Sequence, residues 1–105
     1  MQNTLTILEA LIRIPSYVGN RSDEARIADA VVARLSCLPK RWRVSEQTIE
    51  GNRRNVYVAN ADEPEILLTA HLDTVPPTDA WTRDPFLPSR DGTRLYGLGA
   101  VDMKA

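Results

Sequence analysis

The sequence has little of what disulfide-bonded and membrane proteins depend on. Its single cysteine, Cys37, excludes an internal disulfide. That cysteine lies in a helical pattern, where we expect it to pack as a small hydrophobic side chain. No apolar run approaches the roughly 20 residues of a membrane-spanning helix, and the first residues lack the basic start and apolar block of a secretory signal. We therefore expect a cytoplasmic protein in a reducing compartment, without a membrane partner.

An excess of charge of one sign is also absent. The chain carries 13 basic and 14 acidic residues, a net charge of −1, so nothing in the total favours nucleic acid as a partner. Basic residues do gather between positions 40 and 54, but Glu46 and Glu50 interrupt them, so a solvated sheet face is the better interpretation than a nucleic-acid binder. With 105 residues, 43% hydrophobic and 26% charged, the composition is that of one small globular domain.

Two amphipathic helices are predicted in the first part of the chain. Leucine and isoleucine recur at helical spacing over residues 4–14, and Pro15 ends that pattern. A second helix is expected from an N-cap at Ser22 to about residue 38, before Pro39.

Several short strands are predicted to follow. Residues 42–45 and 55–59 alternate at period two, and Gly51-Asn52 marks a turn between them. The apolar run Ile66–Ala70 predicts a short buried strand, and Leu95-Tyr96 one more beyond a long irregular connection. Helices followed by strands indicate an α/β fold in which helices pack on a mixed β-sheet.

The only histidine, His71, directly follows the apolar run, and Asp73 comes two residues later. Residues i and i+2 of an extended chain share a face, so both side chains are expected to point the same way. A carboxylate beside an imidazole can fix its tautomer and raise its basicity, as carboxylates do for metal-bound histidines. Two alternatives stay open: His71 as a hydrogen-bonded structural residue, and Asp73 as a turn carboxylate.

A second polar group follows a glycine-rich turn, Gly97-Leu98-Gly99-Ala100-Val101-Asp102. A dinucleotide-binding loop is disfavoured, because Asp102 replaces the third glycine and no complete βαβ unit surrounds it. Asp102 is better interpreted as a cation ligand or as an acid at a helix N-terminus. One histidine is too few for most catalytic zinc sites, and no Gly-x-Ser-x-Gly turn exists. The residues alone predict only a partial cation site.

Three segments taken together, residues 66–76, 81–86 and 95–104, resemble the N-terminal part of the co-catalytic zinc amidohydrolase and peptidase family. That family includes acetylornithine deacetylase, succinyl-diaminopimelate desuccinylase, aminoacylases and glutamate carboxypeptidase. The resemblance covers essentially the whole chain and is strongest from residue 66 onward. It implies that residues 1–105 are the N-terminal portion of an incomplete zinc-peptidase-like catalytic domain, without the lid or dimerisation domain.

The resemblance also implies roles for individual residues. His71 would be a ligand of one metal, Asp73 the catalytic-site carboxylate that orients His71, and Asp102 the carboxylate that bridges two metals, followed by a cis peptide bond to Met103. The implied cofactor is Zn²⁺, two per complete site, with Co²⁺ or Mn²⁺ as alternatives. The general base and the remaining ligands would lie beyond residue 105. The chain alone is therefore expected to be inactive and to bind zinc weakly.

The function implied is metal-dependent hydrolysis of the amide bond of N-acyl amino acids, of the deacetylase or desuccinylase kind. The implied partner is a small N-acyl amino acid or a short peptide, and the full-length parent is expected to form a homodimer. Two alternatives remain: a di- or carboxypeptidase of the same family, and a non-catalytic remnant of the fold.

Overall fold

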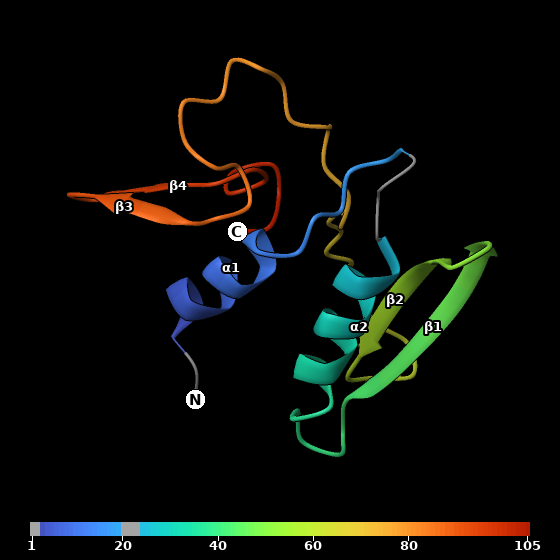
Figure 1. Cartoon of the computed structure of the whole chain (residues 1–105). Coiled ribbons are helices and arrows are strands. Elements are labelled where there is room, and N and C mark those ends of the chain that lie inside the picture. Colours follow the sequence, from blue (N-terminus) through green and yellow to red (C-terminus); the bar gives the residue numbers. More distant parts are fainter. Residues whose placement is uncertain (1–2, 20–23) are drawn as a thin grey trace.

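The computed structural model describes residues 3–19 and 24–105, which form helices and two separate pairs of strands (Figure 1). In chain order the elements are α1 (Thr4–Ile12), α2 (Glu24–Leu35), β1 (Arg43–Glu50), β2 (Arg53–Ala59), β3 (Ser89–Asp91) and β4 (Arg94–Tyr96). Strand β1 pairs with β2 and β3 with β4, both antiparallel. The α/β class agrees with the sequence, but the described residues form two antiparallel pairs and not one mixed sheet.

Helix α1 begins at a capped N-terminus and ends in the core. The Asn3 side chain accepts a hydrogen bond from the Leu5 backbone N–H at 3.0 Å, and such a cap stabilises a helix by about 1 kcal/mol. At the other end Ile12 is fully buried. It packs against Gly97 so closely that a Cβ atom on Gly97 would lie 2.5 Å from Ile12 Cγ2. The end of α1 is thereby fixed against the segment that carries Asp102.

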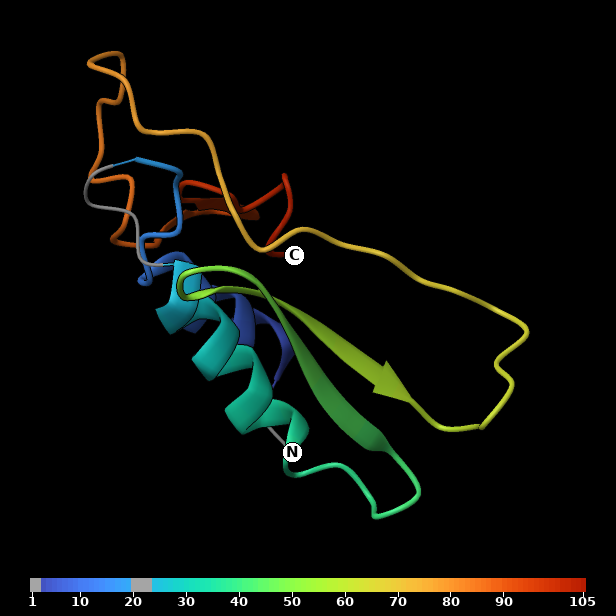
Figure 2. The same ribbon diagram turned by 90° about the vertical axis from the view of Figure 1, so that its right-hand side faces the viewer.

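Helix α2 packs on β2 of the β1–β2 hairpin (Figure 2). Ile27 and Ala28 are its buried residues. Ion pairs join the two elements at the surface, since Arg53 lies 2.8 Å from Glu24 and Arg54 contacts Asp29. The predicted hairpin is confirmed.

The second helix is shorter than predicted, because α2 ends at Leu35. Beyond it Cys37 N and Leu38 N donate to carbonyls three residues back, so the chain tightens into a turn before Pro39. Cys37 lies on that turn and is exposed, so the expectation that it packs in the interior is wrong. The predicted N-cap, Ser22, lies outside the described residues.

The second hairpin is joined to α1. Gly92 adopts a φ of +57° in the turn between β3 and β4, a conformation that favours glycine. Arg90 of β3 donates to Glu9 of α1 at 2.7 Å, and the guanidinium of Arg83 lies 4.1 Å from the ring centre of Tyr96. Strand β4 matches the short strand predicted at Leu95-Tyr96, whereas β3 lies in the stretch expected to be irregular.

The predicted buried strand at Ile66–Ala70 is wrong. Its residues lie in no strand, and Ile66, Leu67 and Leu68 are 79%, 82% and 89% exposed. Figure 2 shows this extended segment running along the outside of the molecule toward the end of the chain. A strand needs a neighbour to satisfy its backbone groups, and in the part of the chain that the structure describes none pairs with residues 66–70.

The segment becomes anchored only after it passes His71. The Thr74 backbone N–H donates to Ser16 O at 3.1 Å, and Tyr17 and Thr74 form an isolated parallel bridge. Within residues 3–19 and 24–105, no helix has the length and apolar character needed to cross a membrane.

Candidate active site

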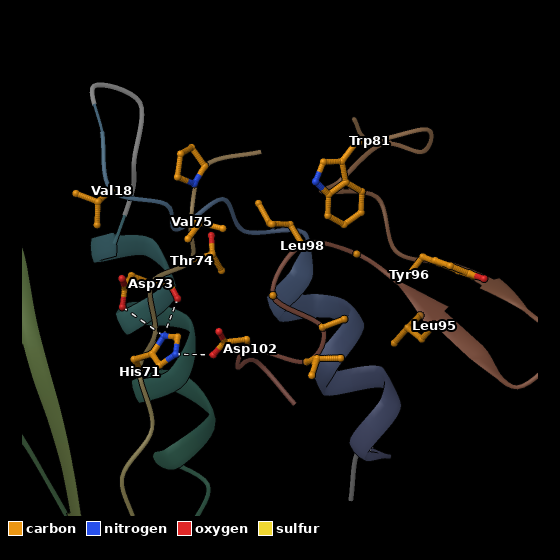
Figure 3. A pocket seen from close by; sticks show the side chains of 15 residues that line it. Val18, His71, Asp73, Thr74, Val75, Trp81, Leu95, Tyr96, Leu98 and Asp102 are labelled. Atoms are coloured by element: carbon orange, nitrogen blue, oxygen red, sulfur yellow. Dashed lines mark hydrogen bonds and ion pairs between the residues drawn. The ribbon is translucent and has the colours of Figure 1, made fainter. Parts of the chain in front are cut away.

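A pocket of about 570 Å³ lies between residues 71–76 and the turn at residues 97–102. Figure 3 shows His71 at one end of it, between Asp73 and Asp102, and Trp81 and Leu98 at the other. Its apolar lining includes Val18, Val75, Trp81, Leu95 and Leu98. The pocket therefore has a polar end made by three sequence-predicted residues and an apolar remainder.

The structure brings His71 and Asp102 into direct contact although they are 31 residues apart, since His71 Nε2 lies 2.8 Å from Asp102 Oδ1. The other ring nitrogen, Nδ1, lies 2.9 Å from the backbone oxygen of Asp73 and 3.5 Å from its Oδ1. A carbonyl oxygen can only accept, so Nδ1 carries hydrogen and donates to it. The backbone carbonyl of Asp73, more than the carboxylate that the resemblance indicated, thus orients the ring.

Both contacts favour the protonated imidazole. The hydrogen bond to Asp102 is the main cause that raises the pKa of His71 above its usual 6.5, and the bond to the Asp73 backbone carbonyl adds to it. Burial opposes this only weakly, because 46% of the His71 side chain and 85% of the Asp102 side chain are exposed. Both ring nitrogens of an imidazolium donate, as this arrangement requires.

The turn that presents Asp102 is closely packed on the segment that carries His71. Gly99 adopts a φ of +80°, and a Cβ atom there would lie 2.8 Å from Thr74 Cγ2. Glycine lets the turn pack this closely against the Thr74 side chain, because it has no Cβ atom. The peptide bond between Asp102 and Met103 is cis, as the resemblance implies.

The polar end of the pocket fits part of a metal site. Imidazole nitrogen and carboxylate oxygen are both zinc ligands, and bonds of about 2.0–2.1 Å place tetrahedral ligand atoms about 3.3 Å apart. The Nε2 to Oδ1 distance of 2.8 Å is that of a hydrogen bond and about 0.5 Å shorter than this separation, so a metal would have to replace the hydrogen and move the two atoms slightly apart. Across residues 3–19 and 24–105, however, no group of three or more His, Cys, Asp or Glu side chains is arranged to hold a metal ion. Two candidate ligand side chains meet here, whereas a catalytic zinc usually has three ligands from the protein.

Two residues that sequence reasoning passed over support the site, one in the pocket lining and one beside it. Thr74 lines the pocket and is only 6% exposed. Lys104 is half-buried, and burial lowers the pKa of its ammonium to about 8. Its Nζ donates to Ile14 O at 2.8 Å and to Leu11 O at 3.1 Å. The sequence offered one signal for Lys104: the last turn of α1 has no basic residue that could donate to the carbonyls at its end.

Known proteins match this chain in two ways. Residues 67–105 match the family model described as peptidase family M20/M25/M40. The acetylornithine deacetylase of Edwardsiella ictaluri is 40% identical over 111 residues, which cover 95% of this chain and 28% of the relative. The succinyl-diaminopimelate desuccinylase of Verminephrobacter eiseniae is 36% identical over 122 residues, covering 99% of this chain and 29% of the relative.

A third relative is the succinyl-diaminopimelate desuccinylase of Xylella fastidiosa, 54% identical over 57 residues that cover 51% of this chain and 15% of the relative. The chain spans less than a third of the length of each of these three curated relatives. The matched family is the one that the resemblance in the sequence indicated: residues 67–105 match peptidase family M20/M25/M40, and the deacetylase and desuccinylase relatives match over nearly the whole chain.

Proposed function

We propose that the chain is part of a zinc-dependent hydrolase that cleaves the amide bond of N-acyl amino acids. The observation that carries this proposal is the 2.8 Å contact between His71 Nε2 and Asp102 Oδ1 at the polar end of one pocket. Relatives named as a deacetylase and a desuccinylase support the class of reaction and the kind of substrate. The predicted location in the cytoplasm and the predicted homodimer belong to this proposal as well.

His71 and Asp102 would hold the metal, and Asp73 would keep His71 in place. The carbonyl of Asp73 accepts from Nδ1, which directs Nε2 toward Asp102. Zinc held by these residues would lower the pKa of a bound water and would polarise the amide carbonyl. The apolar wall around Trp81 and Leu98 would limit the access of bulk water to one side of the site.

The first test measures zinc binding to the chain itself. Zinc is titrated calorimetrically into the unaltered chain, into Asp102→Ala and into Asp79→Ala, whose carboxylate is exposed and outside the pocket. We expect weak binding to the unaltered chain, because only two ligands are present. Asp102→Ala should abolish that binding, and Asp79→Ala should leave it unchanged. Equal binding by all three proteins would contradict the role of Asp102.

The second test measures hydrolysis in a chimera in which this chain replaces the matched part of the Edwardsiella ictaluri acetylornithine deacetylase. With zinc added, the chimera should hydrolyse N-acetylornithine. Asp102→Ala should lower kcat/KM by at least about 100-fold, because several kcal/mol of transition-state stabilisation depend on the metal. Unchanged hydrolysis would end the assignment. A preference for dipeptides over N-acyl amino acids would favour the di- or carboxypeptidase alternative.

A further inference from the structure

Lys104 joins the Asp102 turn to the C-terminus of α1. The last carbonyls of a helix have no partner within the helix. In α1 the carbonyls of Leu11 and of Ile14, just beyond the helix, both accept from Lys104 Nζ, at 3.1 and 2.8 Å. These contacts connect residues 93 and 90 positions apart in the sequence. They are therefore long-range contacts that fix one segment relative to another.

Lys104 also makes a backbone hydrogen bond that stabilises the turn containing Asp102. The backbone N–H of Lys104 donates to Gly99 O at 2.8 Å. The stem of Lys104 passes close to Gly99, since Cδ would lie 3.1 Å from a Cβ atom built there. Asp102 lies between these two residues in the sequence. Its position consequently depends on a turn that Lys104 fixes at both its backbone and its side chain.

The segment just after α1 anchors the other half of the site. Ser16 O accepts from the Thr74 N–H at 3.1 Å, three residues after His71. Residues 11–16 thus anchor both segments of the site: Lys104 attaches the Asp102 turn to them, and Thr74 attaches the segment that carries His71. Without Lys104, the side-chain hydrogen bonds from the Asp102 turn to residues 11–16 would be lost, and the packing of Ile12 on Gly97 would remain.

We propose that Lys104 is a positioning residue, which anchors the Asp102 turn on the carbonyls of Leu11 and Ile14 so that the carboxylate meets His71. An ammonium on a flexible four-carbon stem suits this task, because it can donate to two carbonyls at once. As a statement about metal binding, the inference rests on the proposed function. As a statement about the contact between His71 and Asp102, it stands independently.

The test compares Lys104→Met, Lys104→Arg and Lys40→Met in the metal-free and zinc-titrated chain. Methionine keeps an apolar stem without a donor, arginine restores donors, and Lys40 is an exposed lysine remote from the pocket. In Lys104→Met we expect the ring ¹⁵N shifts of His71 to move toward those of a free histidine. Zinc affinity should fall about tenfold or more, the range typical of residues that orient metal ligands. Lys104→Arg should recover most of the zinc affinity and of the original His71 shifts. Lys40→Met should match the unaltered chain in both measurements.

The outcomes separate this inference from the proposed function. Changed His71 shifts with unchanged zinc affinity in Lys104→Met would support positioning and count against Asp102 as a ligand. Zinc affinity lost in Asp102→Ala but unchanged in Lys104→Met, with unchanged His71 shifts, would overturn the inference and leave the function standing. If Lys104→Met does not fold, hydrogen exchange of the Lys104 ammonium in the unaltered chain decides. Exchange as fast as that of Lys40 would overturn the anchor.

Discussion

The α2–β1–β2 unit and the pocket are stabilised in different ways. The first consists of a helix and a hairpin whose backbone hydrogen bonds connect near neighbours in sequence, with ion pairs such as Arg53–Glu24 between the two. The pocket is built from irregular segments that meet through a few contacts between distant residues, among them His71–Asp102 and Lys104–Ile14. Such contacts are few, so single substitutions should disturb the pocket more than the hairpin.

The largest expected effect tests whether damage to one of the two regions leaves the structure of the other unchanged. Ile12→Ala and Ile27→Ala each remove a buried side chain, one beside Gly97 and one in α2. Each should lower the free energy of unfolding by about 2–5 kcal/mol, the usual range for such core truncations. Chemical denaturation followed by circular dichroism measures this, with the more exposed Leu5→Ala as the control. Under conditions where both variants remain folded, only Ile12→Ala should change the ring ¹⁵N shifts of His71. Equal changes in both would mean that the regions are one cooperative unit.

A smaller effect is expected from adding one methyl group in each region. Gly97→Ala should destabilise the chain by about 1–3 kcal/mol, because the new Cβ overlaps the fully buried side chain of Ile12. Gly51→Ala meets no atom within 4 Å, and its φ of +54° should cost only about 1 kcal/mol. Denaturant midpoints give both values. A greater loss in Gly51→Ala than in Gly97→Ala would contradict the comparison.

The smallest effect concerns pH, because His71 and Asp102 are both exposed to solvent. The pKa of His71 is raised in the folded chain, so the contacts of the protonated imidazole stabilise the fold. This stabilisation is complete below the pKa of the unfolded chain, about 6.5. It is lost as pH rises through the higher folded value. Asp102→Asn removes the main cause and should return the pKa of His71 toward 6.5. Titration of the His71 ring signals in the metal-free chain measures this, with Asp79→Asn as the matched control. An unshifted titration in Asp102→Asn would show that the contact is not formed in solution.

The same contrast explains how much of the fold could be predicted from the sequence. The two helices and the β1–β2 hairpin follow from periodicity and from Gly51-Asn52, which are local signals. The run Ile66–Ala70 predicts an extended conformation, which it adopts, but pairing and burial depend on a neighbouring strand that a local pattern does not specify. The exposure of Cys37 likewise follows from where α2 ends, a boundary that sequence patterns fix only approximately.

The candidate site was predictable only in part, for a related reason. Spacing placed Asp73 beside His71, and only the family resemblance connected either of them with Asp102. The role of Lys104 was not predicted, because its partners are backbone carbonyls about 90 positions away. Every residue type has a backbone carbonyl, so the sequence does not mark such partners. For the same reason, the sequence could not show that Asp73 orients the His71 ring through its backbone oxygen.

The exposed run at residues 66–70 has a practical consequence for handling the chain. Ile66, Leu67 and Leu68 are each more than three-quarters exposed, and residues 66–70 contain no proline and no charge. Such a segment favours pairing between molecules. We therefore expect the chain to be only marginally soluble, most evidently at high protein concentration.

The shared attachment to the end of α1 has a consequence for motion. Because Thr74 and Lys104 are both attached to residues 11–16, a small displacement of that segment should carry the imidazole and the carboxylate in the same direction. Such displacements should then alter the distance between Nε2 and Oδ1 very little. A site formed from loops can in this way keep the geometry of a rigid element.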